Sequence, residues 1–146
     1  MKVLIDADGC PVTDLAVGLA NAHDIECVIL CDTAHNIKRE GIQTITVSKG
    51  ADSVDFALVN LICPGDLVVT QDYGLAAMCM SKRAIVVHQD GFLYIEENID
   101  RLLFFRAAAK KARRGGARIK GPAKRTKEQD QAFCTLLAQL LKEAAT

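Results

Sequence analysis

Short apolar runs alternate with longer amphipathic stretches along the first hundred residues of the chain. The apolar runs lack polar residues at alternate positions, which is typical of strands that are buried on both faces of a sheet. The stretches between them carry apolar residues three and four positions apart, which is typical of helices with one buried face. The pattern predicts five strands, at residues 3–5, 25–30, 43–47, 67–69 and 84–87. It predicts helices that begin at Pro11, at Asp52, near Gly74, near Glu97 and after a capping box formed by Thr126 and Gln129.

This alternation predicts an α/β fold, a three-layer domain around a mainly parallel five-stranded sheet with right-handed crossovers. We divide the chain into an α/β domain at 1–110, a basic glycine-containing linker at 111–127 and a C-terminal amphipathic helix at 128–146. The apolar stripe of this helical appendage packs either on its own domain or on a second copy of the chain, so a homodimer stays open. Residues 92–95 are interpreted as an extra strand, and Phe105 is placed on the inward face of its helix.

The formal net charge of zero conceals a strong asymmetry. The first 100 residues carry fifteen Asp or Glu against six Lys or Arg, whereas residues 101–127 carry eleven Lys or Arg and no acidic residue. Such a basic segment either folds back on the acidic body or binds the phosphates of a nucleic acid. Charge alone does not choose between these two interpretations.

The composition indicates neither a membrane protein nor an exported one. No apolar run exceeds six residues, and the N-terminal run is broken at Asp6, so we expect no membrane segment, no signal peptide and a cytoplasmic location. The six cysteines show no zinc-knuckle spacing, so we expect reduced, mainly buried thiols.

Acidic residues follow the predicted strands at the points where they end. Asp6 and Asp8 follow the first strand, and Asp72 follows the fourth. In open parallel sheets, ligands bind beyond the carboxyl ends of the strands. If the first and fourth strands are neighbours, the three carboxylates converge on one cleft, where a hard divalent cation, Mg²⁺ or Mn²⁺, relieves their repulsion. Asp55, near the start of a predicted helix, is a fourth candidate for this catalytic cluster.

Each of these residues also has an ordinary structural interpretation. Asp6 or Asp72 alone fits a helix N-cap, and Asp8 precedes a glycine as in many turns. Asp55 fits a solvated position in the first turn of its helix, where the helix dipole favours an acid. The functional interpretation rests on their coincidence at strand ends.

Three segments resemble one bacterial family. Residues 3–12 (VLIDADGCPV), 68–76 (VVTQDYGLA) and 115–126 (GGARIKGPAKRT) resemble the motifs of the YaiI/YqxD family, in order and across nearly the whole chain. That family is placed among PIN-like domains, a superfamily of metal-dependent ribonucleases. The resemblance implies a PIN-like sheet of order 3-2-1-4-5, with Asp6, Asp55 and Asp72 in an acidic cleft.

The basic segment predicts a nucleic-acid partner, RNA rather than DNA. Glycine-punctuated chain can follow a phosphate backbone, and each neutralised phosphate releases counterions. Tyr73, beside Asp72, is the aromatic residue placed to stack a base at the cleft, although such a tyrosine also fits simple packing at a helix start. The predicted nucleic-acid-binding residues are Arg113, Arg114, Arg118, Lys120, Lys124, Arg125 and Tyr73.

The sequence thus predicts a Mg²⁺- or Mn²⁺-dependent nuclease that acts on RNA, with two alternatives from other classes. One is a non-catalytic module that binds nucleic acid or the ribosome. The other is a phosphatase, because residues 5–9 (IDADG) resemble the signature of the haloacid dehalogenase superfamily. In that case Asp6 is the nucleophile, Asp8 the acid/base and Thr70 the second motif.

Overall fold

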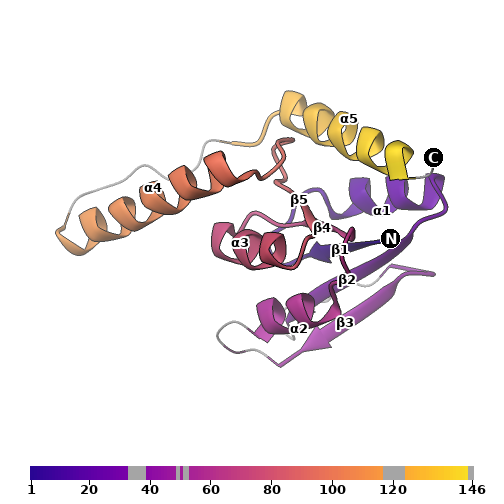
Figure 1. Cartoon of the computed structure of the whole chain (residues 1–146), viewed down its shortest axis with the longest axis horizontal. Helices are drawn as coiled ribbons and strands as arrows, with labels where there is room; N and C mark the ends of the chain where they lie inside the picture. Colours follow the sequence, from indigo (N-terminus) through magenta and orange to yellow (C-terminus); the bar gives the residue numbers. More distant parts are fainter. Residues whose placement is uncertain (33–38, 49, 51–52, 117–123, 145–146) are drawn as a thin grey trace.

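The structure, a computed structural model, describes residues 1–32, 39–48, 50, 53–116 and 124–144 (Figure 1). The strands are Lys2–Asp6 (β1), Glu26–Asp32 (β2), Gln43–Val47 (β3), Leu67–Val69 (β4) and Ile85–Val87 (β5). The helices are Thr13–Ala22 (α1), Ser53–Leu61 (α2), Tyr73–Ser81 (α3), Glu96–Arg114 (α4) and Lys127–Ala144 (α5). The predicted order of strands and helices is confirmed.

The five strands form one parallel sheet in the order β3-β2-β1-β4-β5. This confirms the predicted α/β class and the strand order that the family resemblance implies. β1 lies between β2 and β4, with Ile5 in register with Ile29 on one side and Val69 on the other. The carboxyl ends of β1, β2 and β4 therefore lie together at one edge of the sheet.

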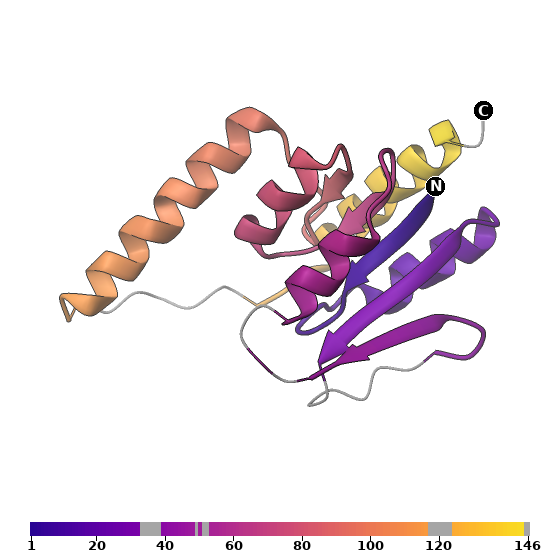
Figure 2. The ribbon, with the colours of Figure 1, turned by 60° about the horizontal axis from the view of Figure 1, so that its bottom comes forward.

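Helices cover both faces of the sheet, as the uniformly apolar strands predict (Figure 2). Successive side chains of a strand point to opposite faces. Val3 and Ile5 accordingly belong to an apolar cluster with α1 and α5, whereas Leu4 belongs to one with α2, α3 and α4. All three side chains are fully buried.

The C-terminal helix packs on its own chain. Thr126 and Gln129 form the predicted capping box, since the amide of each donates to the side-chain oxygen of the other at 2.9 and 3.3 Å. Phe133, Leu137 and Leu141 of α5 are fully buried in the cluster that contains α1 and β1. The apolar stripe of α5 is therefore covered within one copy of the chain.

Arg125 and Gly91 hold the start of α5 against the turn after β5. The Arg125 guanidinium donates to Asp90 Oδ1 at 2.8 Å, to Asp130 Oδ1 at 2.6 Å and to the Gln89 carbonyl at 2.6 Å. Gly91 has φ +91°, and a Cβ there would lie 2.5 Å from the Ala132 carbonyl carbon. The turn therefore needs glycine both for its backbone conformation and for its contact with α5.

Three local expectations were wrong. Residues 92–95 form only a single antiparallel bridge, between Leu93 and Val87, because α4 begins directly afterwards. Phe105 is 59% exposed, because α4 runs beyond the body at this point. α1 begins at Thr13 rather than Pro11, because a turn closed by the Cys10 amide on the Ala7 carbonyl at 3.1 Å precedes it.

The structure also bears on two expectations from the composition, which concern membrane segments and cysteines. None of the helices in the described ranges has the length and apolarity needed to cross a bilayer. All six cysteines are free thiols; three are buried (Cys27, Cys31 and Cys79), and burial raises the pKa of Cys27 to about 11 and that of Cys79 to about 12. Thiols with such pKa values are poor nucleophiles at neutral pH.

Leu137→Ala is expected to lower the free energy of unfolding by about 2–5 kcal/mol, because it leaves a cavity between α5 and the body. Thr135→Ala, on the exposed face of the same helix, is the matched control and should change it by about 0.5 kcal/mol or less. Urea denaturation followed by circular dichroism measures both. Equal, small effects would show that α5 contributes little to the folded domain.

Candidate functional site

The site begins with the pairing of β1 and β4. Asp6 is the last residue of β1 and Thr70 follows β4, and the Thr70 hydroxyl donates a hydrogen bond to Asp6 Oδ2 at 2.7 Å. Thr70 is itself buried, and its backbone carbonyl accepts a hydrogen bond from the Tyr94 hydroxyl at 3.2 Å. Asp6 is therefore held in a fixed position between two central strands.

Asp72 connects this pair to α3. Its amide donates to the Thr70 hydroxyl at 3.0 Å, and its Oδ1 accepts from the amides of Gly74 and Leu75 at 2.9 and 3.2 Å. Asp72 is thus the N-cap of α3, as its structural interpretation predicts. These bonds use Oδ1 alone, so in the part of the chain that the structure describes Oδ2 is the oxygen left for a ligand.

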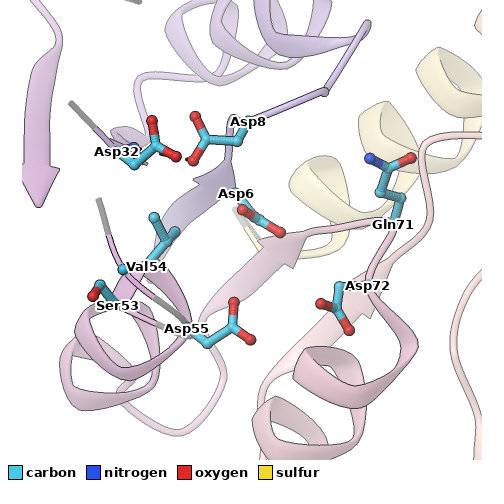
Figure 3. Close-up of a pocket in the computed structure, with 9 residues that line it drawn as sticks. Asp6, Asp8, Asp32, Ser53, Val54, Asp55, Gln71 and Asp72 are labelled. Atoms are coloured by element: carbon cyan, nitrogen blue, oxygen red, sulfur yellow. Dashed lines mark hydrogen bonds between the residues drawn. The ribbon is translucent and has the colours of Figure 1, made fainter. Parts of the chain in front are cut away.

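The other acids come from three different elements. Asp8 lies in the loop after β1, and its Oδ2 accepts a hydrogen bond from the amide of Asp32, the last residue of β2, at 3.0 Å. Asp55 lies in the first turn of α2. Figure 3 shows that these carboxylates lie around the same space as Asp6 and Asp72.

That space is a cavity of about 300 Å³ at the carboxyl edge of the sheet. All four predicted catalytic acids line it. Asp32 lines it as well and was not among the predicted site residues, although its position at the end of an apolar strand is the same signal that marks Asp6. No Lys or Arg is among its described lining residues, which are Asp6, Asp8, Asp32, Gly50, Ser53, Val54, Asp55, Gln71 and Asp72.

Asp6 is harder to ionise than an ordinary aspartate. Burial, together with the negative charges of Asp55, Asp72 and Asp8, raises the pKa of Asp6 from 3.8 to about 6, against the opposing effect of the Thr70 hydrogen bond. A carboxylate in this position gains from any cation that enters the cavity.

The oxygen atoms that line the cavity are suitable ligands for a hard divalent cation, although they do not form a complete preformed metal site. Within the described ranges, no three His, Cys, Asp or Glu side chains are arranged to hold a metal ion as they stand. Mg²⁺, however, is ordinarily held by one or two carboxylates together with water and substrate phosphates. Asp6 and Asp72, from adjacent strand ends, match that smaller requirement, and the oxygen-only lining disfavours zinc.

Arg106 of α4 lies at the rim of the acidic cavity. Its Nη1 donates to Asp72 Oδ1 at 3.3 Å, and its side chain is 56% exposed. Two further hollows, of about 380 and 250 Å³, are lined by both Arg106 and Asp72. Arg106 was not among the predicted site residues; what marks it in the sequence is its position as the first basic residue after the apolar residues of α4.

The predicted nucleic-acid-binding residues fall into different environments. Tyr73 lines the larger hollow beside Arg106 and also packs near Tyr94 and His88, with ring centroids 6.2 and 6.1 Å apart. Arg113 and Arg114 are exposed at the end of α4, and Lys124 is exposed before α5. Arg125 bonds with the body, as described above. Arg118 and Lys120 lie outside the described residues.

His88 is a structural residue of this aromatic cluster. It is 6% exposed and stacks on Phe92 at a centroid distance of 4.4 Å, and its Nδ1 accepts from the Asp90 amide at 2.9 Å. Burial lowers its pKa, which favours the neutral ring.

Comparison with known proteins places the chain in a family. Residues 4–143 match the family described as "Uncharacterized BCR, YaiI/YqxD family". The chain belongs to the YaiI/YqxD family. UPF0178 proteins of Exiguobacterium sibiricum and Clostridium acetobutylicum are 48% and 46% identical to it, and the alignments cover 98% and 97% of each chain. One from Lachnoclostridium phytofermentans is 43% identical over the full length of both chains. No solved structure matches the chain.

Asp6→Asn is expected to stabilise the protein at about pH 7.5 and to have little effect near pH 4. The folded pKa lies above the unfolded one, so the wild type loses stability from this group as pH rises from about 4 through 6. The asparagine carries no charge, so it removes the cost of ionising Asp6 in the folded state, on the order of 1–3 kcal/mol. Its side-chain oxygen can still accept the Thr70 hydrogen bond. Denaturant titrations in EDTA at both pH values measure it, with the exposed Asp100→Asn in α4 as control. A variant that is less stable at both pH values would show that Asp6 is ionised at little cost in the fold.

Proposed function

We propose that this protein is a cytoplasmic Mg²⁺- or Mn²⁺-dependent phosphodiesterase that acts on single-stranded RNA at the cavity beyond β1 and β4. The observation that carries the proposal is the convergence of five aspartates, from β1, its following loop, β2, α2 and the N-cap of α3, on one cavity whose described lining contains no cation. Helix capping accounts for Asp72 but not for Asp6, which accepts its hydrogen bond from the Thr70 hydroxyl.

Each acid has a stated part in the proposal. Asp6 and Asp72 hold the metal ion, and Asp8 and Asp55 complete its ligands or orient water through their acceptor oxygens. When bound, such an ion polarises a phosphoryl oxygen and lowers the pKa of a bound water.

The phosphatase alternative receives less support from the site. That mechanism uses an ionised aspartate as nucleophile and a nearby lysine. Burial and neighbouring charge disfavour the ionised form of Asp6, and the described lining of the cavity contains no lysine; Lys49 lies outside the described residues. The Thr70 hydrogen bond to Asp6 is compatible with either reading.

Mn²⁺ is expected to raise the thermal stability of the wild type but not that of Asp6→Asn or Asp72→Asn. Binding at about 100 times the dissociation constant stabilises the folded state by about 2.7 kcal/mol, and each variant removes one of the two central carboxylates. Differential scanning calorimetry with and without Mn²⁺ measures the shift, and Asp24→Asn is the matched control with its acid outside the cavity. An equal shift in all four proteins would place the metal elsewhere.

Cleavage of a labelled single-stranded RNA should require Mg²⁺ or Mn²⁺ and fall by at least about 100-fold in the Asp6→Asn and Asp72→Asn variants. Gel analysis of the products measures it. Metal-dependent stabilisation without cleavage would favour the non-catalytic binding module. A phosphorylated Asp6 trapped with a phosphate-ester substrate would favour the phosphatase instead.

A further inference from the structure

One face of α4 changes from apolar to basic along its length. Ile99, Leu102 and Leu103 pack in the apolar cluster on the face of the sheet that α2 and α3 cover. Residues three, four and seven positions apart share a helical face. The same face therefore continues through Arg106, Lys110 and Arg113, a set that we call the α4 basic stripe.

The change of character occurs where the helix leaves the body. Figure 1 shows α4 extending outward past α3, on the side toward which the strand arrows point. Arg106 is the first residue of the stripe, and it contacts Asp72 at the rim of the acidic cavity. With a rise of about 1.5 Å per residue, Lys110 and Arg113 follow at about 6 and 10 Å along the axis. The stripe thus begins at the candidate site and leads away from it.

The cations of the stripe are available to a ligand. Lys110 and Arg113 are exposed and form no ion pair with any residue that the structure describes. Arg106 contacts Asp72 at 3.3 Å through an exposed side chain, and exposed ion pairs contribute only about 0–1 kcal/mol. A phosphate, which accepts two guanidinium hydrogen bonds, competes well for such an arginine.

The hollow at the inner end of the stripe favours a single strand over a duplex. It has a volume of about 250 Å³, and its lining includes Arg106, Asp55, Asp72 and Phe56, whose side chain is 61% exposed. Single-stranded nucleic acids are bound by cations along the backbone together with aromatic faces for the bases. An exposed aromatic ring beside Arg106 supplies that combination next to the acidic cavity.

We propose that the α4 basic stripe binds the phosphate backbone of a single nucleic-acid strand and leads it into the acidic cavity, with Arg106 releasing Asp72 to bind the phosphate nearest the cavity. This inference rests on the proposed function. It assigns a positioning role to Arg106 and Lys110, two residues of α4 that precede the glycine-containing segment.

The test compares two double variants that remove the same charges from different faces of α4. Arg106→Gln/Lys110→Gln changes the stripe, and Arg101→Gln/Lys111→Gln removes one arginine and one lysine from the remaining surface of the helix. Glutamine preserves helix propensity. Binding of fluorescently labelled RNA and DNA strands of about 12 nucleotides is measured by anisotropy in EDTA, over about 50–200 mM salt.

The stripe variant should bind each strand at least about tenfold more weakly than the wild type. Its slope of log K against log salt should become shallower by about 1.4, because each of the two lost phosphate contacts contributes about 0.7 to that slope. The control variant should stay within about twofold of the wild type. Equal weakening in both variants would show a general charge effect, and no weakening in either would exclude the stripe; each result overturns the inference. The DNA strand, run in parallel, shows whether sugar chemistry matters.

A second measurement separates this inference from the proposed function. The Mn²⁺-induced stabilisation of the stripe variant should be at least as large as that of the wild type, because Asp72 loses a cationic neighbour. If wild-type protein shows no metal-dependent stabilisation or cleavage but the two variants still differ in RNA binding, the stripe stands and the catalytic proposal fails. If wild-type protein binds neither strand at the lowest salt, the stripe inference fails, whereas the proposed function is decided separately by metal-dependent stabilisation and cleavage.

Discussion

The pairing of β1 with β4 is the constraint on which the candidate site depends. Asp6 and Thr70 are 64 residues apart in the chain. Because Ile5 is in register with Val69, the residues that follow them lie side by side, and a 2.7 Å hydrogen bond joins their side chains. Thr70 in turn accepts the hydrogen bond that places Asp72. Apolar packing on both faces of the sheet therefore holds together carboxylates that repel one another.

The elements and their order follow from the sequence because the strands are short, continuous and apolar, a pattern that fits only a covered parallel sheet. Asp6, Asp8 and Asp72 could be named from the same pattern, since strand ends are visible in the sequence. Their adjacency came from the strand order, which the family resemblance implied and periodicity alone does not contain. Asp32 carries the same strand-end signal but was not selected.

Contacts between distant side chains were beyond the sequence. Nothing in the pattern of α4 shows that Arg106 meets Asp72, because the meeting depends on the angle at which the helix leaves the body. Nor could the sequence separate Arg125 from the other basic residues, although its guanidinium spans Asp90, Asp130 and the Gln89 carbonyl. The basic residues therefore fall into two groups: Arg125 contacts the acidic body, whereas Arg113 is exposed.

The position of α5 in the core has a consequence for how the chain is made. Val3 and Ile5 share one apolar cluster with Phe133, Leu137 and Leu141, which lie well over a hundred residues further along the chain. Synthesis runs from β1 to α5, so this face of β1 and α1 has no cover until α5 has been made. A chain that stops before α5 therefore exposes a contiguous apolar surface, which favours aggregation.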